Sequence, residues 1–385
     1  MTDQTRDSGQ VDESEYTIEE AIYHYLVLEG SSYEVGIQLA EYVKLDAVRR
    51  EFFTSAKLDI HKLGFKSFQL LQEYYEECCP GIIEEIQGLA DGLEVSPEQV
   101  PLWKDSVGIT AGSNCSQLLV LPSASADNHL YLGRSYEWIH TEEDLVLCTT
   151  RVDGKASHIG FTSLLSGRQE GMNEHGLIVS MTGAGIPNQK LKHKGFVFWI
   201  AIRSLLDSCR SVDAALERLE TLPLSGHFNL ILADRKDHAA LLEYADGIMA
   251  VKRITGESPS PFLFSTNHYQ LPETKQFNNL CVIIGHSRHR ASLISSMIRD
   301  NMPCIAKDAI RSLLAANHPD GLCNHFYNDY FGTTWSMILD STTLLADVCF
   351  SAPTHNAFRA FNLSDSVGLD AYPAVIPISK QRLPL

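Results

Sequence analysis

Beyond residue 114, strand-like segments of this chain come in runs separated by pairs of helix-like segments, and this order constrains the fold more than any other feature. Period-two patterns and turn residues predict strands at 116–121, 131–138, 145–152, 158–164, 177–181, 228–233, 239–244 and 262–266, and a hairpin over 333–349. Helical patterns predict one pair at 196–207 and 212–219 and another at 288–299 and 306–315. Antiparallel sheets with helices on their outer faces satisfy this order, so the sequence predicts a layered α+β architecture.

The first 114 residues have a mainly helical character. An apolar run at 21–28 is compatible with a strand, and Ser31 followed by Glu34 has the spacing of a capping box that starts a helix. Further helices are expected at 47–78, 80–92 and 97–105. Residues 1–16 are polar with little to bury, and we expect them to form a flexible tail.

Charge and hydropathy exclude two classes of partner. Residues 1–114 carry 22 acidic and 8 basic side chains, so −14 of the net charge of −17 falls on this part of the chain. Nucleic acid is therefore not expected as a partner. No stretch approaches the roughly 20 apolar residues of a membrane span, and residues 1–20 lack the apolar region of a signal peptide. The sequence predicts no membrane association and a cytoplasmic location.

The nine cysteines are scattered, without CxxC pairs and without histidines at zinc-binding spacing. Neither a disulfide framework nor a metal site is expected from this pattern. Most of these cysteines are expected to be small buried apolar residues. Any cysteine proposed as catalytic therefore needs an argument of its own.

Cys115 has such an argument, because it stands between the small-residue run at 107–114 and a predicted strand. Cleavage of the bond between Asn114 and Cys115 would free the α-amine of Cys115, whose ordinary pKa is about 7.7–8.0. That amine could accept the thiol proton near neutral pH, so one residue would supply both nucleophile and base. The histidines lack metal-binding spacing and are interpreted as ordinary polar residues, and the chemistry needs no cofactor.

Several motifs accompany this cysteine in a fixed order. They are Gly30-Ser-Ser-Tyr-Glu-Val-Gly36, Pro80-Gly-Ile-Ile-Glu-Glu-Ile-Gln-Gly-Leu-Ala-Asp-Gly92, Gly133-Arg-Ser-Tyr-Glu-Trp138, Gly171-Met-Asn-Glu-His-Gly-Leu177, Ser265-Thr-Asn-His268, Gly321-Leu-Cys-Asn-His325 and Thr333-Thr-Trp-Ser-Met337. Through them the whole chain resembles the autoproteolytic acyltransferase/hydrolase family that includes fungal isopenicillin N acyltransferase. It is more distantly similar to the choloylglycine hydrolases and penicillin V acylases.

The resemblance implies a fold and a division of the chain. The fold would be the four-layer αββα sandwich of N-terminal-nucleophile hydrolases. A helical segment, 17–114, would become a separate chain that stays attached to a catalytic chain, 115–385. The family usually has Gly before and Thr after the catalytic cysteine, whereas this chain has Asn114 and Ser116.

The resemblance also implies roles for individual residues. Arg134 and Glu137 would line the site, with Glu137 holding the α-amine of Cys115, although a surface salt bridge is an alternative for this acid. Related acylases have Asp where Glu137 stands and Asn where Ser135 stands. Because Arg134 and Glu137 lie three residues apart on a predicted strand, they are expected to point to opposite faces if the strand is regular.

Two asparagines are further candidates. Asn173 would belong to the site, but it could equally be a turn residue. Asn267 could aim its amide N–H at a developing oxyanion, or it could cap a strand end.

Substrate binding falls to residues near these motifs. Tyr136 is a candidate, and so are Arg288 and Arg290, between which the sequence does not choose. A solvated helix start is the alternative for both arginines.

Two functions from different classes are compatible with these residues. In the first, Cys115 attacks the linear amide of a small N-acyl compound, and water or an amine resolves the thioester, which gives hydrolysis or acyl transfer. The two processed chains would stay associated. In the second, Asn114 prevents cleavage and the protein only binds small acyl or amide ligands.

Overall fold

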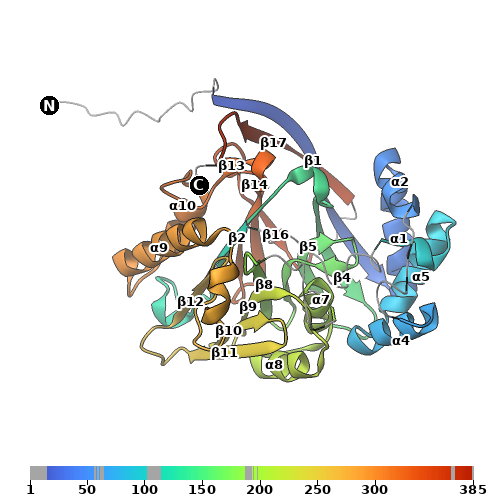
Figure 1. Cartoon of the computed structure of the whole chain (residues 1–385), viewed down its shortest axis with the longest axis horizontal. Coiled ribbons are helices and arrows are strands. Elements are labelled where there is room, and N and C mark those ends of the chain that lie inside the picture. Colours follow the sequence, from blue (N-terminus) through green and yellow to red (C-terminus); the bar gives the residue numbers. More distant parts are fainter. Residues whose placement is uncertain are drawn as a thin grey trace.

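The structure is a computed structural model, and it describes residues 15–55, 58, 60, 65–101, 114–186, 193, 195–196, 198–365 and 369–383. Strands within these ranges form two sheets, which we call sheet A and sheet B (Figure 1). Sheet A has the order β11 (Ile248–Thr255), β10 (His238–Ala245), β9 (His227–Ala233), β8 (Ile178–Gly183), β7 (Glu170–Asn173), β5 (His158–Ser163), β4 (Val146–Val152), β1 (Tyr16–Gly30) and β17 (Leu369–Ser379), with β6 (Gly167–Arg168) paired to β5. Sheet B has the order β12 (Phe262–Ser265), β2 (Asn114–Val120), β3 (Tyr131–Trp138), β14 (Phe331–Asp340), β15 (Leu345–Phe350) and β16 (Arg359–Asn362), with β13 (His325–Phe326) paired to β14.

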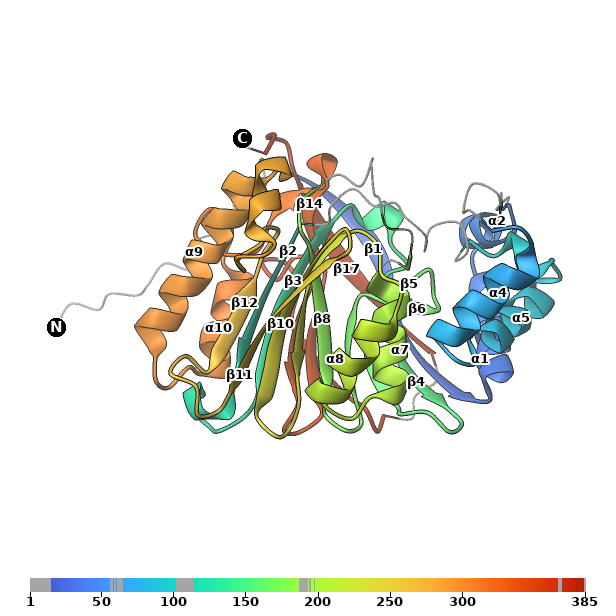
Figure 2. The same cartoon turned by 60° about the horizontal axis from the view of Figure 1, so that its bottom comes forward.

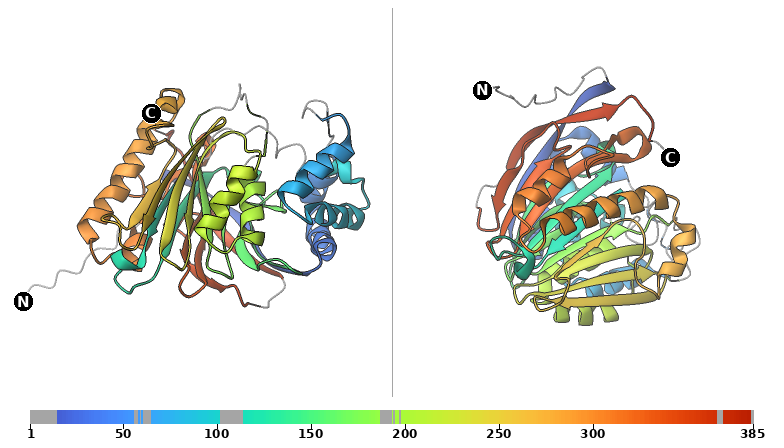
Figure 3. Two further views of the ribbon diagram at one scale, coloured as in Figure 1. Left: turned by 90° about the horizontal axis from the view of Figure 1, so that it is seen from below. Right: turned by 90° about the vertical axis from the view of Figure 1, so that its left-hand side faces the viewer.

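Helices cover the outer faces of both sheets. α7 (Phe198–Ser208) and α8 (Val212–Thr221) pack on sheet A, and α9 (Ile284–Asn301) and α10 (Lys307–Ala315) pack on sheet B. The inner faces meet through β2 and β8. Figure 2 shows this succession edge-on, and the right-hand view of Figure 3 shows α9 and α10 lying across sheet B. The expected α+β fold, a four-layer αββα sandwich, is confirmed.

The part of the chain before residue 114 also contributes to sheet A. β1 pairs in parallel with β4 and antiparallel with β17, so it is an internal strand of that sheet. The apolar run at 21–28 is thus the centre of a longer strand that already begins at Tyr16. Of the tail expected at 1–16, residues 1–14 lie outside the described residues. The N-terminal segment therefore combines a structural strand with its helices.

Within the described residues, the helices that follow β1 are α1 (Ser32–Lys44), α2 (Ala47–Ser55), α4 (Phe68–Cys78) and α5 (Ile82–Leu93). The expected capping box is confirmed, because the Ser31 side chain accepts from the Glu34 amide and the Glu34 side chain accepts from the Ser31 amide. The helix expected over 47–78 is instead divided, because α2 ends at Ser55 and Ser67 caps a new start at α4. Of the helix expected at 97–105, a short 3₁₀ turn covers Pro97–Gln99, and 102–105 lie outside the described residues. No helix in the described ranges combines the length and apolar character that a bilayer crossing requires.

Two glycines allow α1 and α5 to cross closely. A Cβ atom added at Gly36 would lie 2.0 Å from the carbonyl oxygen of Glu85 in α5. A Cβ at Gly88 would lie 2.1 Å from the carbonyl oxygen of Tyr33 in α1. Backbone atoms cannot yield to such an approach, so only glycine fits at either position. The glycines of the two N-terminal motifs thus have a packing role.

A buried ion-pair network joins α5 to α7. Arg203 Nη2 lies 2.9 Å from Glu85 Oε2, and Arg203 Nε lies 2.8 Å from Asp207 Oδ1. Burial alone would raise the pKa of Asp207, but Arg203, His158 and Lys155 lower it to about 2. This charge cluster lies at the contact between the N-terminal helices and the sandwich. Removing one of its members would lower the free energy of unfolding, because the remaining charge would be buried without its partner.

The crossing of α1 and α5 generates a stability prediction. We expect Gly88→Ala to lower the free energy of unfolding by at least about 2 kcal/mol, because the new methyl group overpacks against backbone. Gly285→Ala is the matched control, since a Cβ at this helical position of α9 meets nothing within 4 Å. That change should be neutral or stabilising by up to about 1 kcal/mol. Urea unfolding of both variants measures the difference, and equal stabilities would contradict the packing argument.

Candidate active site

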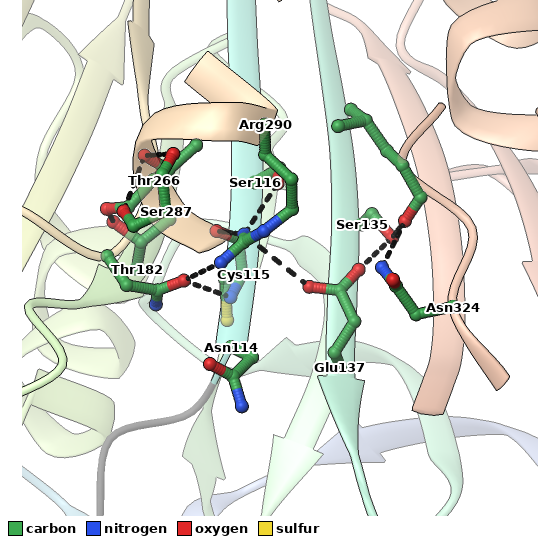
Figure 4. Close-up of polar contacts among 12 residues, drawn as sticks. Asn114, Cys115, Ser116, Ser135, Glu137, Thr182, Thr266, Ser287, Arg290 and Asn324 are labelled. Atoms are coloured by element: carbon green, nitrogen blue, oxygen red, sulfur yellow. Dashed lines mark hydrogen bonds and ion pairs between the residues drawn. The ribbon is translucent and has the colours of Figure 1, made fainter. Parts of the chain in front are cut away.

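Cys115, the second residue of β2, is fully buried, and side chains from three different elements contact it. Its backbone N–H donates to Asn267 Oδ1 at 3.1 Å, and Arg134 Nη2 lies 3.8 Å from its sulfur. Its carbonyl oxygen accepts from Arg290 Nη1, and Figure 4 shows this arginine between β2 and Glu137. The sulfur, amide and carbonyl of one cysteine are thus each contacted by a polar side chain.

The register of β2 against β3 decides which side chains share a face. Cys115 pairs with Tyr136, and Arg134 lies two residues before Tyr136, so these side chains point to the face of sheet B that meets sheet A. Glu137 pairs with Asn114 and points to the opposite face, toward α9. Arg134 and Glu137 therefore lie on opposite faces, as their spacing of three predicts for a regular strand.

Arg134 reaches from sheet B into sheet A. Its Nε forms an ion pair with Glu170 of β7, and its Nη1 donates to the carbonyl oxygen of Met181 in β8. Burial lowers the pKa of Arg134, but Glu170 and then Cys115 raise it by more, and the net shift is upward. The guanidinium is therefore a fixed cation beside the Cys115 sulfur, and a cation in that place favours the thiolate.

A second buried pair lies on the other face of β2 and β3. Arg290 Nη1 is 3.9 Å from Glu137 Oε2, and the Ser135 hydroxyl donates to Glu137 Oε1. Arg290 also donates to Ser116 Oγ at 2.8 Å and to Asn267 Oδ1. Burial raises the pKa of Glu137 to about 7, although Arg290 and the Ser135 hydroxyl oppose the shift. This carboxyl therefore titrates close to neutral pH.

Asn267 lies two residues after the end of β12, and hydrogen bonds hold its side chain on two sides. Its Nδ2 donates to the carbonyl oxygen of Gly183 at 2.8 Å, which leaves Oδ1 facing β2. The preceding carbonyl, that of Thr266, accepts from Thr182 Oγ1 at 2.8 Å and from Asn229 Nδ2 at 3.0 Å. The Asn267 amide group thus fixes the backbone of β2 against the end of β8.

Asn173 makes its hydrogen bonds away from Cys115. Its Nδ2 donates to the carbonyl oxygens of Leu206 and Cys209 at 3.0 and 2.8 Å, and its Oδ1 accepts from the amides of His175 and Leu177 at 3.1 Å each. Its side chain therefore joins the turn after β7 to the end of α7. This is the turn role that the sequence left open.

The other expected residues differ in position. Arg288 is exposed, whereas Arg290 is fully buried and donates to the carbonyl oxygen of Cys115. Tyr136 stacks on the ring of Trp335 at a centroid distance of 4.0 Å, and its hydroxyl donates to Glu143 Oε1 at 2.5 Å. Tyr136 thus forms an aromatic wall next to Cys115.

Sequence reasoning missed two partners of the arginines. Ser116 and Glu170 were not candidates, yet Ser116 accepts from Arg290 and Glu170 pairs with Arg134. The available signal for Glu170 was an acidic residue directly before the Gly171-Met172-Asn173 motif, inside a strand whose residues are all buried. An acid in such a strand requires a buried counter-charge.

Thiols and possible metal ligands are dispersed. All nine cysteines are free thiols, and each is buried except Cys304. Over the part of the chain that the structure describes, no cluster of three or more His, Cys, Asp or Glu side chains is arranged to hold a metal ion.

Comparison with known proteins gives one family and several solved structures. The sequence profile of the acyl-coenzyme A:6-aminopenicillanic acid acyl-transferase family matches residues 124–355, which is more than half of the chain and begins after Cys115. No match was found among curated protein sequences. Penicillin V acylase from Agrobacterium tumefaciens is similar with 14% identity and a TM-score of 0.41, over 67% of this chain and 90% of that chain. A mutant of the conjugated bile acid hydrolase from Clostridium perfringens is similar with 11% identity and a TM-score of 0.42, over 70% of this chain and 100% of that chain.

The buried Glu137 carboxyl generates a prediction about pH. Its pKa in the folded state, about 7, lies above the ordinary value of 4.5, so the folded protein binds this proton more tightly than the unfolded chain. The contribution of this carboxyl to the free energy of unfolding is fully present below about pH 4.5, and it is lost as the pH rises through 7. Wild type should therefore lose about 3 kcal/mol between pH 4.5 and 8 that Glu137→Gln does not lose. Urea unfolding at both pH values measures this, and parallel pH dependences would refute it.

Proposed function

The chain belongs to the acyl-coenzyme A:6-aminopenicillanic acid acyl-transferase family, which makes it an acyltransferase or amide hydrolase of the N-terminal-nucleophile type, and we propose that its nucleophile is the thiol of Cys115. The observation that carries the proposal is the arrangement around this one cysteine. Arg134 lies at the sulfur, Arg290 binds the carbonyl oxygen, and an amide oxygen accepts from the backbone N–H.

We propose that maturation begins with attack of Cys115 Sγ on the carbonyl carbon of Asn114. A C–S bond forms, the C–N bond between the two residues breaks, and the departing nitrogen takes the proton that the thiol lost. Water then hydrolyses the thioester, which releases the Asn114 carboxylate and restores the thiol. Arg134 supports this step because a fixed cation lowers the cost of forming a thiolate in a buried site.

In the cleaved protein, the α-amine of Cys115 serves as the base. Its ordinary pKa of about 7.7–8.0 suits proton transfer from the thiol near neutral pH. Glu137 pairs with Asn114 in the β2–β3 register, so it lies beside the bond that cleavage opens. In this proposal its carboxylate, present above about pH 7, holds the new ammonium group until the amine gives up its proton.

The reaction follows from these roles. The thiolate attacks the carbonyl of a linear amide in a small N-acyl compound, the amine leaves, and a thioester remains on Cys115. Water as the second reactant gives hydrolysis, whereas a second amine gives acyl transfer. The proposal requires no cofactor, no nucleic acid and no membrane, and it is compatible with a cytoplasmic location.

The proposed division into 17–114 and 115–385 keeps the two processed chains together. β1 belongs to the first chain but is hydrogen-bonded on both sides to strands of the second. The ion pair of Glu85 with Arg203 also joins the two chains in a buried environment. Dissociation would expose both contacts, so we propose that the processed chains form one stable unit.

A second candidate function is supported by the residue at the bond itself. Asn114 is buried, is bulkier than the glycine usual in the resembling family, and donates from Nδ2 to the carbonyl oxygen of Tyr330 at 3.1 Å. If this anchoring stops the bond from adopting the geometry for attack, the protein remains uncleaved and binds small acyl or amide ligands without turning them over. Intact mass distinguishes the two functions.

Cleavage and acylation test the proposed function together. Purified wild type should show two fragments divided at Asn114/Cys115, and the Cys115 peptide should carry an acyl adduct after incubation with a panel of N-acyl compounds. Cys115→Ala should remain a single chain, whereas Cys148→Ala, which alters a buried cysteine of β4, should still cleave. Two fragments from Cys115→Ala would show that the thiol is not responsible for processing.

The identity of the base gives a separate prediction. If the α-amine is the base, no single substitution among His140, His175, His268, His286 and His325 to Ala should abolish activity of the processed enzyme. His268, for example, hydrogen-bonds Ser287 Oγ at 2.7 Å, and burial lowers its pKa to about 4. Measurement of kcat/KM for the five variants tests this. A loss above about 10³-fold in one of them, with processing and fold intact, would establish a cysteine–histidine pair instead.

A further inference from the structure

Glu170 is a fully buried acid whose surroundings are set by Arg134. It begins β7, where it pairs with Ser180 of β8, and the next residue of β8, Met181, supplies the carbonyl that Arg134 Nη1 binds. β7 and β8 thus receive the guanidinium of Arg134 together, with Glu170 at Nε and the Met181 carbonyl at Nη1. Burial raises the pKa of Glu170, and the cation of Arg134 opposes that shift. The acid and the arginine therefore depend on each other in this interior.

The direction in which the guanidinium points follows from these contacts. A guanidinium is planar and rigid, so an acid at Nε and a carbonyl at Nη1 fix the direction of the remaining nitrogen, Nη2. That nitrogen is the one 3.8 Å from Cys115 Sγ. Without Glu170, Arg134 keeps its contacts with β8 and with the Tyr136 ring but loses the acid at Nε, which is the group that balances its charge.

We propose that Glu170 is the positioning residue that holds Arg134 on the Cys115 sulfur and sets the positive potential that the sulfur experiences. The proposal rests on the proposed role of Cys115 as nucleophile. It adds a residue of sheet A to a site whose other charged residues come from sheet B and α9. Glu170 contacts Arg134 directly and acts on the sulfur through this arginine.

The effect of removing Glu170 on the Cys115 thiol can be measured separately from that of Glu137, because each acid pairs with a different arginine. Among the described residues, the charged and titratable groups near Cys115 or its two arginines include Arg134, Tyr136 and Glu137 of β3, Glu170 of β7 and Arg290 of α9, with Glu143 behind Tyr136 and with Cys281, His268 and His318 near Arg290. Glu137 balances Arg290 on the opposite face of the strand. Glu170 is the acid that pairs directly with Arg134.

Opposite effects on the thiol are expected from removing the acid and from removing the cation. Glu170→Gln keeps an acceptor for Arg134 Nε but removes the negative charge, so the cation is less neutralised and the thiolate more favoured. The pKa of the Cys115 thiol should fall by about one unit. Arg134→Gln removes the cation itself, so the same pKa should rise above the wild-type value. A role in stability alone would move neither.

The pKa is measured on protein labelled with ¹³C in its cysteines, from the pH dependence of the Cys115 Cβ chemical shift, assigned by its loss in Cys115→Ser. The matched control is Glu85→Gln, which removes another buried acid from an arginine, in a network between α5 and α7. This control should leave the thiol pKa at the wild-type value even if it lowers stability. A Glu170→Gln titration within about 0.2 units of wild type would overturn the proposal.

Glu170→Asp keeps the test decisive if Glu170→Gln does not fold. This variant keeps the charge but shortens the reach to Arg134 Nε, so the guanidinium shifts away from the sulfur and the thiol pKa should rise above the wild-type value. We expect the rate of Cys115 acylation to fall by about tenfold or more at unchanged KM. Wild-type acylation kinetics in Glu170→Asp would contradict the positioning role.

The titration separates this proposal from the proposed function. It needs no substrate and can be run on cleaved or uncleaved protein. If the wild type is neither cleaved nor acylated, the assignment of Cys115 as nucleophile is wrong, while the shift between wild type and Glu170→Gln still decides whether Glu170 acts on the sulfur.

Discussion

The register between β2 and β3 is the constraint on which the site depends. All seven residues of β2 are buried, because sheet A covers one face of the strand and α9 covers the other. Cys115 therefore lies between two buried layers, and each layer contributes an arginine paired with a glutamate. On one side the sulfur meets Arg134, and on the other the backbone meets Arg290. A slip of one residue would exchange the two sides and separate the sulfur from its cation.

Burial alone would make a poor nucleophile of a cysteine in this protein. It raises the pKa of Cys78 and Cys79 to about 12 and that of Cys323 to about 11. What distinguishes Cys115 is the pair of buried arginines, each backed by an acid from another strand or face. Such pairs are costly to bury, and they recur at functional sites because they hold a charge in place before the reaction starts.

Much of this arrangement follows from the sequence, because it is local. The capping box of α1, the hairpin that carries Cys115 and Arg134, and the helical pairs are patterns within short segments, and their order is enough to predict the layers. What the sequence leaves open is settled by distant contacts. The role of Glu170 becomes visible only in its ion pair with Arg134 of the other sheet. Arg290 and Arg288 can be told apart only by their burial in the fold. Nothing local predicts β17, in which Pro373 and Pro377 interrupt the strand pattern.

Because β1 lies between β4 and β17, the N-terminal part of the chain is a structural component of sheet A. Within the described residues, β17 finds its ladder partner only in β1, and β4 uses β1 on the side away from β5. A catalytic chain made without residues 16–30 would therefore present two unpaired strand edges, one of them seven residues long in β4. Such edges are templates for pairing between molecules. The N-terminal strand β1 thus joins β4 to β17 within sheet A. Its loss would be seen first as aggregation, while the chemistry of the cysteine would still be intact.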